Sequence, residues 1–189
     1  MTVDELIVWM EAKATRVCDF MTYEPAERPG AELADCLDAW FGSRAWRDTG
    51  HRFVDLGEDC GGMLAAWLRP SHPGSCPIVF FGSEGEAGVL CASADKWVQL
   101  LGHAPTIDEG VRGVIPAHIC DERSMCLDEG FDPERADEAH WSLNLYRESL
   151  RADFGDLPPL DELTSGLEAL NGALARWIAG VFHAARPVG

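Results

Sequence analysis

Residues 53–91 read FVDLGEDCGGMLAAWLRPSHPGSCPIVFFGSEGEAGVLC, and this stretch decides the fold class. It holds four short runs of apolar and aromatic residues, which are Phe53–Leu56, Met63–Leu68, Ile78–Phe81 and Val89–Cys91. Glycine, proline and acidic residues separate the runs, as is typical of turns between neighbouring strands. The stretch therefore predicts an antiparallel meander.

Helical patterns precede this central stretch. Apolar residues recur every three or four positions from Val3 to Met21, which predicts an amphipathic helix. A second, shorter helix is expected to end at Gly42, and its apolar side carries Leu33, Leu37, Trp40 and Phe41. We expect these two helices to pack together.

Helical patterns also follow the stretch. Ser93 is expected to cap a helix that contains Trp97 and Leu101 and ends at Gly102, whereas residues 103–131 are expected to form a loop. Asp132-Pro133 then begins a helix that reaches about Leu150 and carries Trp141, Leu145 and Tyr146. After Pro158-Pro159, a stripe from Leu160 to Val181 predicts one last helix. The fold class is therefore α+β, with a central, mainly antiparallel sheet flanked by N-terminal and C-terminal helices.

The chain is strongly acidic. It has 189 residues, with 15 Lys and Arg against 32 Asp and Glu, and its formal net charge is −17. Such a field repels phosphate backbones and anionic lipid headgroups, and it accelerates association with a basic protein. We therefore expect a protein partner, no direct nucleic-acid binding and no membrane binding.

Two further patterns bear on location and redox state. No apolar run is long enough to cross a bilayer, and Asp4 and Glu5 stand where a secretory signal would carry basic residues. The 7 cysteines are an odd number without a CxxC pair, which favours reduced thiols. We expect a cytoplasmic protein.

No motif of catalytic or cofactor-binding spacing occurs in the sequence. We therefore expect no enzyme, no cofactor and no catalytic residue. His118, Cys120 and Cys126 supply nitrogen and sulfur donors within a short segment, but the spacing matches no common zinc module and lacks an obvious fourth ligand. We expect no metal, and a zinc-binding protein or enzyme that uses these three residues remains an alternative.

The central stretch resembles the SUKH superfamily of bacterial immunity proteins. The resemblance lies in the order of an acidic, glycine-rich turn after a first strand, a later strand followed by Glu84, and a serine, Ser93, at the start of a tryptophan-containing helix. It covers residues 53–102. The Asn-Gly-Gly segment usual upstream in the family is absent, and Ser83 stands where a histidine often precedes the acidic residue.

The length of the chain predicts one domain over residues 1–189, with a helical C-terminal extension over 103–189 that the resemblance does not cover. The resemblance implies an α+β domain that binds and neutralises a cognate bacterial toxin without catalysis of its own. Carboxylates on two turns would then meet Arg and Lys of the toxin. These expected partner-binding residues are Asp55, Glu58 and Asp59 on the first turn and Glu84 and Glu86 on the second.

Trp67 is the expected aromatic anchor if it faces outward, because tryptophan is enriched at interface hot spots. The alternative is a place in the core on one face of the sheet. A different class of function also stays open, which is an acidic secretion chaperone that binds an extended effector segment in an apolar groove.

Overall fold

The computed structural model describes residues 1–13, 24–26, 33–59, 62–103 and 133–185. Its centre is a sheet whose strands lie in the order β1-β2-β3-β4-β5, with every neighbouring pair antiparallel. The strands are β1 (Glu24–Pro25), β2 (Arg52–Asp59), β3 (Gly62–Leu68), β4 (Ile78–Phe81) and β5 (Ala87–Cys91). The predicted meander is confirmed as β2 to β5, and the short β1 adds a strand that the apolar pattern did not predict.

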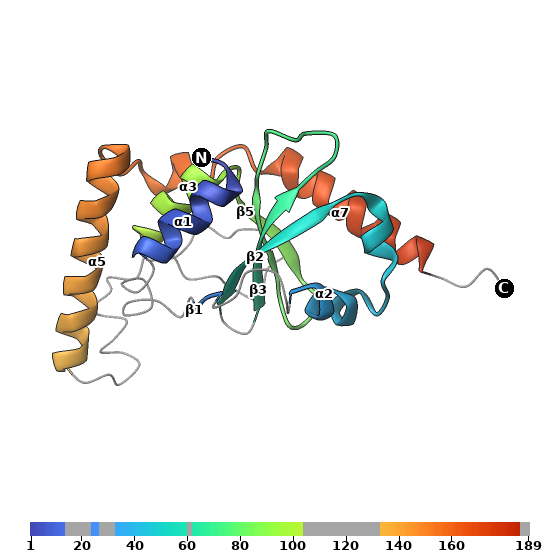
Figure 1. Cartoon of the computed structure of the whole chain (residues 1–189), viewed down its shortest axis with the longest axis horizontal. Coiled ribbons are helices and arrows are strands. Elements are labelled where there is room, and N and C mark those ends of the chain that lie inside the picture. The colour runs from blue at the N-terminus through green and yellow to red at the C-terminus, as the bar shows by residue number, and fades with distance from the viewer. Residues whose placement is uncertain (14–23, 27–32, 60–61, 104–132, 186–189) are drawn as a thin grey trace.

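Helices cover both faces of this sheet (Figure 1). They are α1 (Val3–Lys13), α2 (Leu33–Phe41), α3 (Ala94–Leu101), α5 (Pro133–Phe154), α6 (Leu160–Leu163) and α7 (Glu168–Ala184), with a short 3-10 helix, η2 (Ala45–Thr49). The α+β class with flanking helices is confirmed. No helix among the described residues is long and apolar enough to span a bilayer.

Alternation along the strands divides the interior into two cores. Leu64 and Phe80 are paired across β3 and β4 and contribute to the first core, whereas Ala65 and Val79 are paired and contribute to the second. Paired residues point to the same face of a sheet, and successive residues point to opposite faces. Both faces are apolar, so each requires its own layer of helices.

The first core lies under α1, α3 and α5, and the second lies under α2 and α7. Leu6 of α1 and Leu37 of α2 are both fully buried, but on opposite faces of the sheet. The expectation that the two N-terminal helices pack together is therefore wrong. Their apolar stripes are satisfied by the sheet instead of by each other.

The predicted last helix is interrupted. Helix α6 ends at Leu163, and α7 begins at Glu168. Gly166, between the two helices, has a φ of 70°. Leu163 belongs to the first core and Leu167 to the second. A continuous helix cannot bury side chains on both faces of the sheet, so the expectation of one helix is wrong at this crossing.

The other predicted helical features are largely confirmed. The Ser93 hydroxyl accepts a hydrogen bond from the backbone N of Lys96 at 3.4 Å, so Ser93 caps the N-terminus of α3 as predicted. Helix α5 begins at Pro133, and Tyr146 is fully buried, whereas Trp141 is 64% exposed. The expected helical turns after Lys13, the cap at Asp132 and, apart from His103, the expected loop over 103–131 lie outside the described residues.

Candidate protein-binding surfaces

The two acidic turns of the meander lie at the same end of the sheet. Glu58 pairs with Met63 across β2 and β3, and Met63 pairs with Phe81 across β3 and β4, so the β2–β3 and β4–β5 connections share that end. The side chains of Glu58 and Glu84 are both exposed there. Strands two places apart are separated by about 10 Å, so a single partner surface can span both turns.

Asp59 and Asp55 occupy different positions relative to this end. Asp59 pairs with Gly62 beside the β2–β3 connection, which places its backbone with that of Glu58. The Asp55 side chain accepts a hydrogen bond from the backbone N of Gly57 at 3.0 Å. Gly57 has φ 119°, and the register shifts between Asp55 and Gly57. Asp55 therefore supports a β-bulge that only a glycine accommodates easily.

Glu86 does not present its carboxylate as expected. Both carboxylate oxygens are buried, and they have no hydrogen-bond partner among the described residues. The carboxyl group packs over Gly82, where even a Cβ atom would lie 2.3 Å from its Cδ. The backbone of Glu86 also closes the hairpin, because its O accepts from the N of Gly82 at 2.9 Å. Glu86 is thus an internal group of the turn.

Trp67 lies in the sheet core, so the outward-facing alternative is wrong. Its side chain is fully buried in the second core. Its Nε1 donates to Nδ1 of His51 at 2.8 Å, and the guanidinium of Arg69 lies 5.1 Å from the centre of its ring. Phe53, paired with Trp67 across the sheet, belongs to the same core face. Trp67 cannot act as a surface anchor in this conformation.

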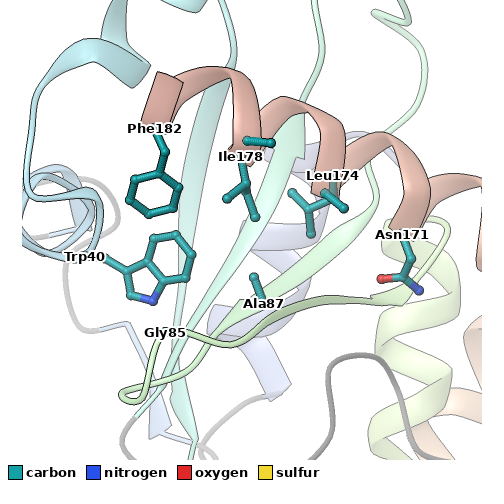
Figure 2. A pocket seen from close by; sticks show the side chains of 9 residues that line it. Trp40, Gly85, Ala87, Asn171, Leu174, Ile178 and Phe182 are labelled. Carbon is teal, nitrogen blue, oxygen red and sulfur yellow. The ribbon is translucent and has the colours of Figure 1, made fainter. Parts of the chain in front are cut away.

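A groove that the sequence did not reveal lies between α7 and the β4–β5 hairpin (Figure 2). Its volume is about 410 Å³. The residues that line it are Trp40, Gly85, Ala87, Asn171, Leu174, Ala175, Ile178, Ala179 and Phe182. None of these side chains carries a charge, so the groove is an apolar site of the size that ligands and peptide segments occupy.

The rim of the groove is aromatic at one end. Trp40 and Phe182 lie 6.1 Å apart between ring centroids, and Phe182 is 43% exposed. The Trp40 Nε1 donates to the backbone O of Gly82 at 2.9 Å, which attaches α2 to the β4–β5 hairpin. A sequence signal for this rim existed in the aromatic pair Trp40-Phe41, but nothing local indicates that α7 lies opposite.

The chemistry-bearing residues supply no alternative site in the described part of the chain. Burial raises the pKa of the Cys91 thiol to about 12 and that of Cys76 to about 11, so neither is a ready nucleophile. No group of three or more His, Cys, Asp or Glu side chains suitable for a metal occurs among the described residues. His118, Cys120 and Cys126 lie outside those residues, and the zinc alternative stays a prediction.

Comparisons of the chain with protein-family models, with curated proteins and with solved structures find no match.

Proposed function

We propose that this protein is a bacterial immunity protein of the SUKH type that binds a cognate, basic toxin and neutralises it without catalysis. The observation that carries the proposal is that two exposed acidic side chains, Glu58 and Glu84, lie at the same end of the sheet in a chain of net charge −17. Carboxylates placed in this way suit the Arg and Lys side chains of a basic partner.

Electrostatic attraction to a basic toxin predicts how the association and dissociation rates depend on salt. Long-range attraction is screened within a Debye length of about 10 Å at 0.1 M salt, whereas close contacts in a formed complex are screened less. Association with the toxin should therefore slow as the salt concentration rises, and dissociation should change little.

The test uses the protein encoded by the neighbouring open reading frame as the candidate toxin, purified and immobilised, together with protection of cells that express it. Glu58→Gln combined with Glu84→Gln should slow association severalfold at low salt. The matched control, Glu11→Gln combined with Glu148→Gln, removes the same charge from exposed positions on α1 and α5 and should have a smaller effect.

Three outcomes would contradict parts of this proposal. Equal slowing in both double variants would place the interface elsewhere than the acidic turns. A protein that fails to bind or protect against the neighbouring toxin would not be its immunity protein. A homodimer that holds an unfolded effector segment, but leaves the folded toxin active, would be the secretion chaperone.

A further inference from the structure

Helix α7 and the edge of β5 form a channel along the groove. β5 is the last strand in the order of the sheet, and the groove residues on α7 extend from Asn171 to Phe182. At a rise of 1.5 Å per residue, that part of α7 is about 16 Å long. Figure 2 shows Asn171 at one end, Trp40 and Phe182 at the other, and Ala87 between them. A length of about 16 Å corresponds to about five residues of extended chain.

The floor of this channel offers backbone hydrogen-bonding groups. The N of Val89 points away from β4, because it donates to Oδ1 of Asn171 at 2.8 Å. Val89 and Ala87 pair with Val79 and Phe81 in one regular register. Residues two apart in an antiparallel strand direct their N–H and C=O groups to the same side, so those of Ala87 also point away from β4, toward the free edge of β5 beside the groove.

Among the described residues, no backbone partner is seen for the edge of β5 at Ala87. The outward N–H of Val89 donates its hydrogen bond to the side chain of Asn171, whereas Ala87 and Gly85 line the groove itself. An extended peptide can therefore pair with the backbone at Ala87 and place an apolar side chain among Leu174, Ile178 and Phe182. A strand edge that no described residue pairs with, beside an apolar pocket, is the arrangement used in β-strand addition.

The negative charge beside the groove favours a peptide whose apolar segment is flanked by basic residues. Glu84 is exposed next to the lining residue Gly85, and the chain as a whole carries −17. On α7, the exposed Arg176 and His183 are not among the residues that line the groove. An apolar segment with basic residues at the hairpin end is therefore complementary to this site.

We propose that the groove binds an extended apolar segment of the partner protein, flanked by Arg or Lys, which adds to the edge of β5 at Ala87. The inference rests on the proposed function, because it takes the partner to be the basic toxin. It adds a second contact beside the acidic turns, one that depends on backbone pairing and apolar burial.

The direct test uses the fluorescein-labelled peptide Arg-Arg-Val-Leu-Val-Leu-Gly, with binding followed by anisotropy and by the amide resonance of Ala87. Two control peptides carry Pro in place of the first Val, or Glu in place of both Arg. We expect the first peptide to bind and to shift the Ala87 amide, and each control peptide to bind at least about tenfold more weakly.

Three protein variants locate the site. Ala179→Trp adds a bulky side chain at an exposed position that lines the groove, and Ala87→Pro removes the outward N–H without removing a bond of the β4–β5 ladder. Both should weaken peptide binding about tenfold or more. The control is Trp141→Ala, which removes a tryptophan side chain that is 64% exposed on α5 and does not line the groove. It should leave peptide binding unchanged.

The inference is overturned if the first peptide does not bind at concentrations of about 1 mM, or if it binds the proline control and the Ala179→Trp variant equally well. A homodimer that Ala179→Trp dissociates would assign the groove to a second copy of the chain instead. If Ala179→Trp binds and neutralises the toxin normally, the inference fails and the proposed function stands. If the peptide binds as expected but the toxin is not neutralised, only the proposed function fails.

Discussion

The indole Nε1 of the buried Trp67 donates a hydrogen bond to Nδ1 of His51 at 2.8 Å. The His51 ring also stacks on Trp177 of α7, with 5.1 Å between ring centroids and 15° between planes. Nδ1 accepts this bond only while it carries no proton. Burial, together with the nearby positive charge of Arg69, lowers the pKa of His51, which favours the neutral form that the bond requires.

This relationship predicts a loss of stability in weak acid. Because the folded state lowers the pKa of His51, the unfolded chain binds more protons as the pH falls. The stabilising contribution of neutral His51 is complete above about pH 6.5, the ordinary pKa of histidine. It is lost as the pH falls through the lower pKa that His51 has in the folded state. Urea unfolding between about pH 8 and pH 5 should show the decline.

His51→Phe should remove this part of the pH dependence. It should also lower stability at pH 8 by about 1–3 kcal/mol, because the indole N–H of Trp67 stays buried without its acceptor. His72→Asn, at an exposed position, is the control and should retain the decline. If His51→Phe and the parent protein decline equally with falling pH, another group controls the effect.

Two separate cores predict additive effects of mutations on opposite faces of the sheet. Leu6 and Leu37 are both fully buried, the first under α1 and the second under α2. Each Leu→Ala change should cost about 2–5 kcal/mol of unfolding free energy, and the double variant about the sum. Val8→Ala, at a residue 66% exposed on α1, should cost little. A coupling above about 1 kcal/mol would contradict the separation of the cores.

The start of β3 should not tolerate a side chain. A Cβ atom on Gly62 would lie 2.2 Å from the Phe80 ring and 3.1 Å from the backbone O of Phe81. Gly62→Ala should therefore destabilise the protein by about 1–3 kcal/mol, because Phe80 has to move within a packed core. Gly74→Ala, where a Cβ atom would meet open space, should be close to neutral. Thermal unfolding of both variants provides the comparison.

The buried thiols should resist alkylation in the folded protein. With pKa values of about 12 for Cys91 and about 11 for Cys76, roughly one molecule in 10⁴ and one in 10³ carries the thiolate at pH 8. Peptide mass spectrometry after treatment with iodoacetamide should find both residues modified in urea and nearly unmodified without it. Rapid labelling of Cys91 under native conditions would show that β5 opens readily.

Local features of the strands and of α3 could be predicted from the sequence. The short apolar runs between turn residues predicted β2 to β5, because run length and turn chemistry are properties of neighbouring residues and do not depend on what covers the sheet. The cap at Ser93 is equally local, since it needs only a hydroxyl and the N–H three residues later. The common end of the two acidic turns also follows from strand order alone.

Which layer each helix joins could not be predicted. The stripe from Leu160 to Val181 has helical spacing throughout, but Leu163 and Leu167 face different cores. An apolar pattern shows that a side chain is buried without showing against which surface. The same ambiguity misplaced α2 beside α1, and it left two environments open for Trp67.

The sequence by itself therefore determined the α+β class, the meander and the net charge of −17. Only the tertiary structure decided that Glu86 turns its carboxylate inward, that Trp67 bonds to His51, and that Trp40, Ala87 and Phe182 enclose a groove. Composition, periodicity and turn chemistry act over a few residues. Burial and cavity shape arise where segments far apart in the chain pack together, and their geometry depends on all of those segments at once.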